Sequence, residues 1–378
     1  MPHQAWLYRT LGFLTFWLVT SPLGVGALPS YTLTDLGPCE VRGMSQEGVA
    51  VIVGDCNNVA TVLYPYTREL GVITPGGIGS IAEGTAWRYV VGSSSAGTHG
   101  GPTHSFVWTL AGGLQELGTT GASTLSSFAV DVNVGGVIVG YGDHATQDRI
   151  IALLWCCDGG VFPLQDLHPR TRSRALSINR WGDVVGTATT PEGVLHPILW
   201  GGRGGMWDLH AGSATPGVAV GINTWRMVVG WHVPQEGPRA FLWTEERGRQ
   251  TLPPLGDDTT SFALALNDWG VPVGMSVREG PQASLSSTAA VLWSGDTPLA
   301  LAELVQPEPD WTLVSALAIN NAGMITGMGL HHGQRRGYLL TPTWRTIVRE
   351  SSTPRAQAET HGTVLRVLLP RGSGKWVP

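Results

Sequence analysis

Residues 175–188, ALSINRWGDVVGTA, decide how this chain of 378 residues folds. The stretch has the pattern of a hairpin, with an apolar strand, a turn at Asn-Arg-Trp-Gly and a second apolar strand. Nearly the same phrase returns as AVGINTWRMVVGW from Ala219 and as ALALNDWGVPVGM from Ala263. Self-similarity at a nearly fixed period indicates a repeat architecture, so the number of copies and the way they join determine the fold.

Each repeat opens with this hairpin, which in four copies carries an Asn, a Gly three residues later and a Gly seven residues later, while the copies at Ser45 and Thr85 are degenerate. The Asn can cap a type I turn, and the first Gly supplies the positive φ of a bulge that matches the strand twist. Arg226 replaces the first Gly after Asn223, and Arg88 takes the equivalent place in another copy, so those two turns must differ or carry strain. The seven copies begin at Ser45, Thr85, Asn133, Asn179, Asn223, Asn267 and Asn320.

Two further phrases follow the hairpin in each repeat. One is a short strand that ends in a large apolar residue, at Tyr64, Trp108, Trp155, Trp200, Trp243, Trp293 and Leu340. The other is a short closing strand, usually with an acid before Leu, from TDLG at Asp35 to LAEL at Glu303. The first closing strand precedes the first hairpin and none follows Leu340, so the series is shifted circularly by one strand.

Four short strands in a period of about 40 to 53 residues are what one propeller blade contains. An open solenoid would need capping repeats at both ends, whereas residues 31–37 can complete the last blade and leave no exposed sheet edge. The sequence therefore predicts an all-β, seven-bladed β-propeller of four-stranded blades. The Ala that recurs four places before each Asn suits a crowded inner strand, and we expect the five repeat tryptophans at 108, 155, 200, 243 and 293 to fill the space between blades.

Composition agrees with this fold class and limits the function. Gly at 52 residues and charged residues at 13% indicate many tight turns and few solvated helices. The one Lys is Lys375, and the repeats carry no basic patch, so we expect no nucleic-acid partner. Residues 1–27 have the pattern of a secretory signal cleaved after Ala27, which predicts an extracellular or periplasmic protein with no transmembrane anchor after cleavage. We expect the propeller in 28–342 and a disordered tail in 343–378.

The four cysteines suggest at most two disulfides. Cys39 and Cys56 flank the first repeat and are the expected pair in an oxidising compartment. Cys156 and Cys157 are adjacent in the sequence. They form either a strained vicinal disulfide or two reduced thiols. Neither a CxxC pair nor a catalytic or cofactor motif occurs, so we expect no metal, no cofactor and no catalytic residue.

The repeat resembles the bacterial HAF-repeat proteins, also called probable extracellular repeat proteins. The resemblance depends on SINRWGDVVG, GINTWRMVVG and AINNAGMITG joined to RAFLW and LQELG, and it runs from about Tyr31 to Leu340. The His of the family's His-Ala-Phe signature is kept at His104 and His196 alone. The resemblance implies export, and it brings no catalytic residue or ligand.

One feature exceeds what the repeat needs, because Trp stands in the inner turns of four blades, at Trp87, Trp181, Trp225 and Trp269. A propeller places these turns on one face near the channel mouth, where indoles can stack on sugar rings. Alternatively, each indole folds back onto the neighbouring blade and seals the core, or the turns contact a protein. The polar groups that could bind sugar hydroxyls beside them are Asn179, Arg180, Asn223, Asn267 and Asp268.

Three functions remain open from the sequence. The first is a secreted module that binds glycans or a cell-surface polymer, and the second is an extracellular scaffold for protein contacts without a small ligand. The third is a hydrolase or lyase assembled on the opposite face, where longer loops join the second and third strands. We expect the recurrent acids to pair across strands with His104, His196, Arg239 or Arg336 as part of the structure.

Overall fold

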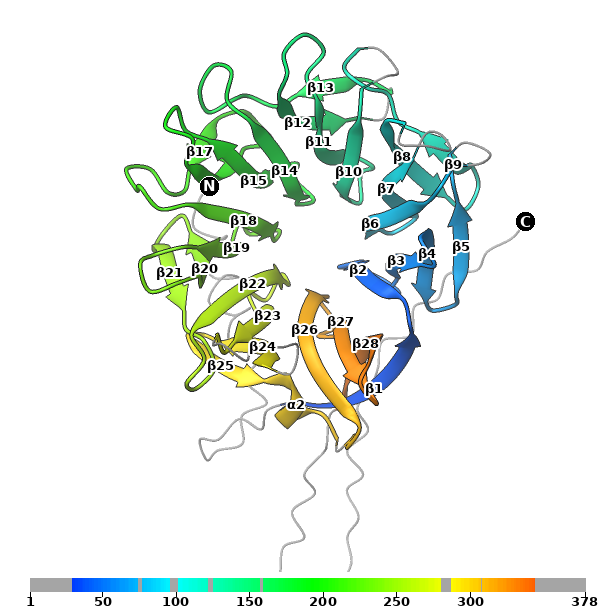
Figure 1. The fold of residues 1–378 in the computed structure, drawn as a ribbon, viewed down its shortest axis with the longest axis vertical. Helices are drawn as coiled ribbons and strands as arrows, with labels where there is room; N and C mark the ends of the chain where they lie inside the picture. Colours follow the sequence, from blue (N-terminus) through cyan, green and yellow to red (C-terminus); the bar gives the residue numbers. More distant parts are fainter. Residues whose placement is uncertain are drawn as a thin grey trace, which may run out of the picture. The chain divides into compact units, whose positions relative to one another are not determined.

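The computed structural model describes residues 29–73, 77–95, 101–121, 125–156, 159–279, 287–306 and 308–343. Within them lie seven antiparallel sheets of four strands each, arranged as blades in a ring (Figure 1). The predicted seven-bladed β-propeller is confirmed. The predicted signal segment, and the predicted tail beyond its first residue, lie outside the described residues.

The strands follow the order expected for blades built from the inside outwards. Blade 1 contains β2 (Glu40–Met44), β3 (Ile52–Cys56), β4 (Val59–Tyr64) and β5 (Arg68–Gly71), and blade 2 contains β6 (Ser80–Ala86), β7 (Tyr89–Ser95), β8 (Thr103–Thr109) and β9 (Gly113–Glu116). Blade 3 contains β10 (Ser127–Val132), β11 (Ile138–Asp143), β12 (Ile150–Trp155) and β13 (Val161–Pro163), and blade 4 contains β14 (Ser173–Ile178), β15 (Val184–Thr189), β16 (Leu195–Trp200) and β17 (Met206–Asp208). Blade 5 contains β18 (Gly217–Ile222), β19 (Val228–His232), β20 (Arg239–Thr244) and β21 (Gly248–Leu252), and blade 6 contains β22 (Thr260–Leu266), β23 (Pro272–Val277), β24 (Thr288–Ser294) and β25 (Thr297–Ala300). Blade 7 contains β26 (Trp311–Ile319), β27 (Ile325–His331), β28 (Gln334–Thr343) and the N-terminal β1 (Ser30–Gly37).

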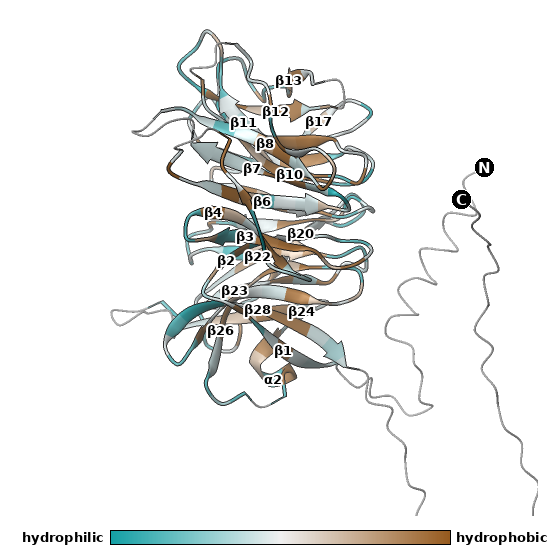
Figure 2. Ribbon diagram, turned by 90° about the vertical axis from the view of Figure 1, so that its right-hand side faces the viewer, coloured by the Kyte–Doolittle hydropathy of each residue, from teal (hydrophilic) through white to brown (hydrophobic). Residues whose placement is uncertain are grey.

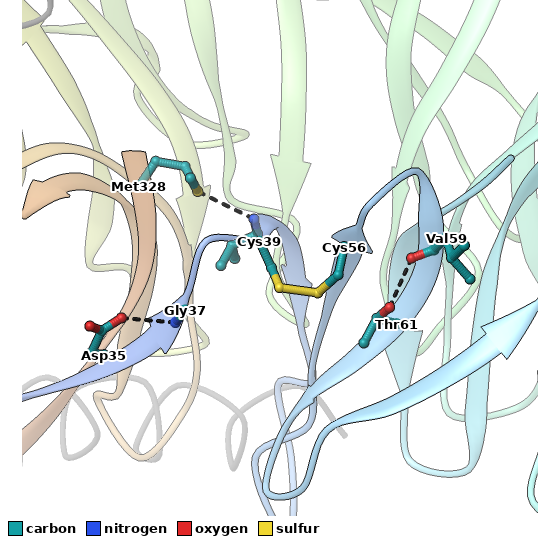
Figure 3. Close-up of a disulfide and its surroundings, with 8 residues drawn as sticks. Asp35, Gly37, Cys39, Cys56, Val59, Thr61 and Met328 are labelled. Atoms are coloured by element: carbon teal, nitrogen blue, oxygen red, sulfur yellow. Dashed lines mark hydrogen bonds between the residues drawn. A yellow bond between two sulfur atoms is a disulfide. The ribbon is translucent and has the colours of Figure 1, made fainter. Parts of the chain in front are cut away.

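The head of the chain closes the ring. β1 pairs antiparallel with β28, with Leu33 opposite Leu340, so it supplies the fourth strand that the last repeat lacks. Beside this seam a disulfide joins Cys39, in the connection from β1 to β2, to Cys56 at the end of β3 (Figure 3). This is the pair expected from the sequence. Cys156 is a free thiol, and Cys157 lies outside the described residues.

A bulge in every inner strand explains the most regular glycine of the repeat. The register of each inner strand shifts by one residue, as between Ala175 and Ser177 in β14, and β26 has a second such shift. Opposite this bulge, a Cβ added to Gly186 would lie 1.9 Å from the carbonyl oxygen of Arg174, a distance that no side chain can adopt. The same 1.9 Å clash occurs in all seven blades, at Gly54, Gly92, Gly140, Gly186, Gly230, Gly274 and Gly327.

The core lies between the blades, and the apolar segments of the strands form it (Figure 2). Trp155, Trp200 and Trp293 are buried as expected, and each indole N–H donates to a backbone carbonyl of the preceding blade, on Gly118, Gln165 and Pro253 respectively. Trp108 and Trp243 are half-buried against the same kind of core. The Ala residues of the inner strands are fully buried, at 129, 175, 219, 263 and 316.

The expected closing strands are wrong in detail in three blades. In blade 3, β13 ends at Pro163, before the acid of the phrase LQDL, and in blade 5, β21 ends before Pro253. Proline has no N–H to continue a strand ladder, so pairing stops at these positions. In blade 6, β25 ends at Ala300, and the phrase LAEL forms the short helix α2 (Leu301–Leu304), with Leu301 buried.

Two faces of the propeller follow from the antiparallel order. The turns between first and second strands and between third and fourth strands open on one side, called here the turn face. The loops between second and third strands and the connections between blades open on the other side, called the loop face.

Candidate binding face

The large apolar side chains that are exposed gather on the turn face. Of those in the described residues, Ile78 alone lies on the loop face, in the connection from β5 to β6. Their concentration on one face makes the turn face the candidate interaction surface, because apolar surface gathered in one region often marks a binding site. The residues in or next to turns of the turn face are Val49, Tyr66, Trp87, Leu110, Val134, Phe162, Trp181, Trp207, Trp225 and Trp269.

The four turn tryptophans of the sequence hypothesis are part of this surface. Trp87 is 66% exposed, Trp181 63% and Trp225 56%, so these indoles do not fold back to seal the core. Trp269 is 39% exposed, and its indole N–H donates to the carbonyl of Asn321 in the next blade at 2.9 Å. The fold-back alternative therefore applies to Trp269 only in part.

The buried turn asparagines stabilise the turns that carry these side chains. In blade 4 the Oδ1 of Asn179 accepts from the backbone N–H groups of Trp181 and Asp183, at 2.9 Å each. The Nδ2 of Asn179 donates to the carbonyl of Asn223, whose own Nδ2 donates to the carbonyl of Asn267. The same link recurs from Asn133 to Asn179 and from Asn267 to Asn320, so a chain of side-chain amides joins five blades.

This chain corrects the sequence hypothesis. Asn179, Asn223 and Asn267 are buried and hydrogen-bonded within the protein, so they are not the groups that bind sugar hydroxyls. Asp268 is also engaged, since its Oδ1 accepts from the N–H of Thr224 and its Oδ2 from Nδ2 of Asn321. The amide-to-carbonyl links cross from one blade to the next, which the pattern of a single hairpin does not reveal.

Arg180 is the predicted polar residue that lies open beside an indole. Its guanidinium carbon is 5.2 Å from the centre of the Trp181 ring, and its Nη1 is 3.4 Å from Oε1 of Glu47. Glu47 belongs to the inner turn of blade 1, whereas Arg180 belongs to that of blade 4. In the same blade 1 turn, Nε2 of Gln46 donates to the carbonyl of Leu266 in blade 6. The blade 1 turn therefore reaches across the channel mouth on the turn face.

The two inner turns that lack the usual glycine reach the required positive φ in different ways. In blade 5 Arg226 itself adopts φ +62°, the left-handed region that costs an ordinary residue about 1–2 kcal/mol. In blade 2 the hairpin is shorter, since Ala86 pairs directly with Tyr89, and Trp87 takes φ +52°. The expectation that these turns differ or carry strain is confirmed.

A fifth tryptophan, missed in the sequence, joins blades 4 and 5. Trp207 in β17 is 43% exposed, and the guanidinium carbon of Arg226 lies 4.8 Å from the centre of its ring. Sequence reasoning used its phrase MWDL only for the acid. The signal available was the run GGRGG before it, because Cβ atoms at Gly201 or Gly205 would lie 2.9 Å from the indole.

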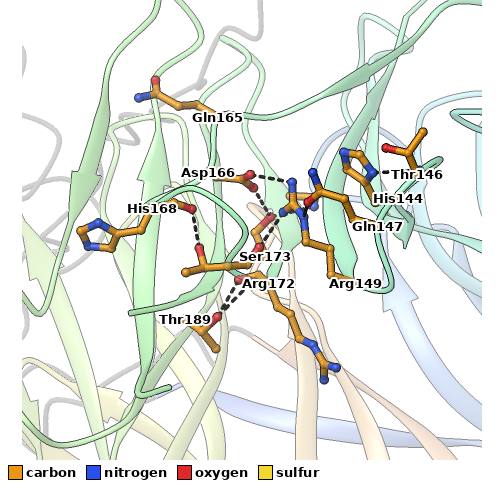
Figure 4. A network of polar contacts seen from close by, with 12 residues as sticks. His144, Thr146, Gln147, Arg149, Gln165, Asp166, His168, Arg172, Ser173 and Thr189 are labelled. Atoms are coloured by element: carbon orange, nitrogen blue, oxygen red, sulfur yellow. Dashed lines mark hydrogen bonds and ion pairs between the residues drawn. The ribbon is translucent and has the colours of Figure 1, made fainter. Parts of the chain in front are cut away.

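On the loop face the expected acid pairs are present and repeat from blade to blade. His104 lies 2.6 Å from Glu116, His196 2.8 Å from Asp208, and Arg336 2.8 Å from Asp35. Figure 4 shows the counterpart in blade 3, where Arg149 lies 2.9 Å from Asp166. Arg239 was expected to join such a pair. Its Nη1 instead donates to the carbonyls of Pro238 and Thr259, because the closing phrase of blade 5, PPLG, has no acid.

A pocket of about 450 Å³ lies beside one of these pairs. It is lined by His196, Asp208, His168 and Glu192, among others. A histidine beside a carboxylate is a common acid–base arrangement. Here the pair recurs as His104 with Glu116 in blade 2, so joining the third and fourth strands of a blade accounts for it.

Three buried histidines lie together where blade 4 meets blade 5. The ring of His210 is 5.5 Å from that of His196 and 5.7 Å from that of His232, measured between centres. Both ring nitrogens of His210 and Nε2 of His232 are buried without a hydrogen-bond partner among the described residues. Burial, with a further contribution from Arg249, lowers the pKa of His210 and of His232 to about 4 each.

The described residues contain neither a cluster of side chains that could bind a metal ion nor a helix that could span a membrane. No group of three or more His, Cys, Asp or Glu residues among the described residues is arranged to hold a metal ion. No helix within those residues is long and apolar enough to cross a membrane.

Comparisons with known proteins show distant likeness in fold. No protein-family model matches the chain, and no curated protein matches it. A solved streptogramin B lyase has a TM-score of 0.46 at 12% identity, over 83% of this chain and 98% of that one. The SapL1 lectin in complex with alpha methyl fucoside has a TM-score of 0.41 at 12% identity, over 70% and 95%. A gluconolactonase from Xanthomonas campestris has a TM-score of 0.38 at 11% identity, over 84% and 95%.

Proposed function

We propose that this protein is a carbohydrate-binding β-propeller that stacks sugar rings on the indoles of its turn face. The observation that carries the proposal is the exposure of the turn tryptophans, between 39% and 66%, on a single face of the ring. An indole plane matches the apolar face of a pyranose, and nearby polar groups can bind its hydroxyls. Arg180 beside Trp181 is such a group.

The arrangement also suits a long ligand better than a single sugar. Trp181, Trp225 and Trp269 stand in the same position of three successive blades, so one polymer chain can meet more than one indole. Linked weak contacts raise the apparent affinity without any single tight site. A cell-surface polymer or an extracellular polysaccharide is therefore the expected ligand, in keeping with the proposed export of the chain.

A glycan array with the full-length mature protein tests this proposal. Wild type is expected to bind one or more glycans, and the double variant Trp181→Ala with Trp225→Ala is expected to lose that binding. Ile78→Ala is the matched control, because Ile78 is an exposed apolar side chain on the opposite face. No binding by wild type, or equal binding by the double variant, contradicts the proposal.

A protein partner is the second candidate, and one observation favours it. Val49, Leu110 and Val134 are exposed on the same face, and aliphatic side chains add little to sugar stacking while they contribute to protein interfaces. Under this alternative, Val49→Asp and Leu110→Asp would abolish binding to the partner, whereas under the carbohydrate proposal they leave glycan binding unchanged.

A further inference from the structure

We infer that the main sugar subsite lies where blade 4 meets blade 5, on Trp207 and Arg226, and that its ligand is an uncharged glycan. This inference rests on the proposed function and adds to it both a place and a ligand class. Trp207 is a tryptophan outside the four repeat turns: it belongs to β17, the outer strand of blade 4, and it contacts Arg226 in the inner turn of blade 5.

The indole of Trp207, called the shelf here, is fixed in orientation by its neighbours. Its ring lies over two glycines of the β16–β17 turn, and a Cβ at Gly201 or Gly205 would come within 2.9 Å of ring carbons. On the blade 5 side, the guanidinium of Arg226 stacks against the ring at 4.8 Å. The part of the indole left uncovered by these neighbours, in a residue that is 43% exposed, is an apolar edge of fixed orientation, so little conformational entropy is lost when a sugar packs against it.

The backbone of Arg226 gives independent support. Glycine occupies the matching turn position in four blades, at Gly136, Gly182, Gly270 and Gly323, each with positive φ. Arg226 adopts φ +62° in their place. The other blades show that glycine is sufficient for the fold at this position. An arginine in this costly conformation therefore indicates a role in the binding site rather than in the blade.

Polar groups beside the shelf match neighbouring hydroxyls. Nε of Arg226 lies 3.5 Å from Oδ2 of Asp183, and its Nη1 lies 3.8 Å from Oε2 of Glu245. Asp183 is buried and accepts from the N–H of Gly202, whereas the Glu245 side chain is 77% exposed. Arg226 and Glu245 thus present donors next to acceptors, the combination that pairs with vicinal hydroxyl groups of a sugar.

The charges of this region do not favour an acidic ligand. Arg226 is already paired with Asp183 and Glu245, and Arg180 is paired with Glu47. Counting the exposed Arg203 of the β16–β17 turn, the cations Arg180, Arg203 and Arg226 only balance the anions Glu47, Asp183 and Glu245. A carboxylated or sulfated polymer therefore finds no excess of positive charge. An uncharged sugar needs no such excess, so its binding depends little on salt.

The test uses an array that carries both uncharged and acidic glycans, followed by titration of the strongest uncharged ligand. Trp207→Ala and Arg226→Gly are each expected to weaken binding about tenfold, the range expected for loss of one aromatic stack. Arg226→Gly restores the residue that other blades use, so it preserves the fold, and thermal unfolding verifies this. Ile78→Ala is the control, because Ile78 is an exposed apolar side chain on the loop face, and it is expected to change the affinity less than about threefold.

Two results would overturn the inference while leaving the proposed function in place. One is a preference for acidic glycans, with an affinity that falls steeply between about 50 and 500 mM NaCl. The other is a larger loss from Trp87→Ala than from Trp207→Ala. Absence of glycan binding by wild type, or unchanged binding by the variant lacking Trp181 and Trp225, would instead remove the proposed function itself.

Discussion

Acidification from pH 7.5 to about 5 should weaken the fold where blade 4 meets blade 5. His210 and His232 are buried side by side, and burial lowers the pKa of each to about 4. An unfolded histidine has a pKa of about 6.5, so below that pH the unfolded chain takes up protons that the folded chain refuses. The stability that the neutral rings contribute is therefore present above pH 6.5 and is lost as the pH falls towards 4.

The size of the effect follows from the pKa differences. At pH 5 the pH lies about 1.5 units below the pKa of a histidine in the unfolded chain. Protonation of the unfolded chain therefore lowers the free energy of unfolding by about 2 kcal/mol per ring, or about 4 kcal/mol for both. Asp131 acts in the opposite sense, because burial raises its pKa to about 6, and proton uptake by the folded chain then adds about 1.4 kcal/mol at pH 5. The net expectation from these three groups is a loss of about 2.5 kcal/mol.

Urea unfolding of the full chain at pH 7.5 and pH 5 measures this difference. The double variant His210→Phe with His232→Phe replaces rings that leave buried nitrogens unpaired, so it should be at least as stable as wild type at pH 7.5. At pH 5 it should be about 4 kcal/mol more stable than wild type, whereas Asp131→Asn should remove the opposing gain. If the double variant loses as much stability on acidification as wild type, the histidine cluster does not cause the acid sensitivity.

Three further outcomes follow from the same structure. Gly186→Ala should cost about 3 kcal/mol or more in urea unfolding, because its Cβ would lie 1.9 Å from the carbonyl oxygen of Arg174; a loss below about 1 kcal/mol would show that the bulge can relax. Asn223→Ala should cost about 3 kcal/mol, since it leaves the N–H groups of Trp225 and Met227 without the Asn223 acceptor and removes one of the two donors to the carbonyl of Asn267; an unchanged unfolding midpoint would contradict this role of the amide chain. N-terminal sequencing of the protein secreted by a bacterial host should begin at Leu28, directly after the proposed cleavage site, and an intact N-terminus would contradict the proposed signal.

The closure of the ring was predictable because it depends on counting. Strand phrases can be read locally, and an extra closing strand at Asp35 with none after Leu340 leaves one arrangement without free edges. The bulge opposite Gly186 was not predictable in this way. It depends on the register between two strands, and a recurring glycine in one hairpin is equally compatible with a turn or with close packing.

The candidate site was predictable in part for a similar reason. The turn that contains Trp181 does not need a tryptophan at this position, and the exposure of Trp181 agrees with the sequence hypothesis. The role of Asn223 was mistaken, because one hairpin shows the carbonyl end of the amide capping its own turn and hides the amino end, which reaches the next blade. Trp207 was missed because its neighbours in space, above all Arg226, come from another repeat.

Repetition itself helps to separate the residues that serve the fold from those that serve a ligand. All seven blades keep the glycine opposite the bulge, and five keep the turn asparagine, as expected for residues that serve the fold whatever the protein binds. Arg226 interrupts that pattern at a cost in backbone conformation, and it does so beside Trp207, the exposed tryptophan of a fourth strand. Glycine would relieve the backbone at this position, and we propose that the arginine instead serves a ligand contact on the turn face between blades 4 and 5, where it already lies against Asp183 and Trp207.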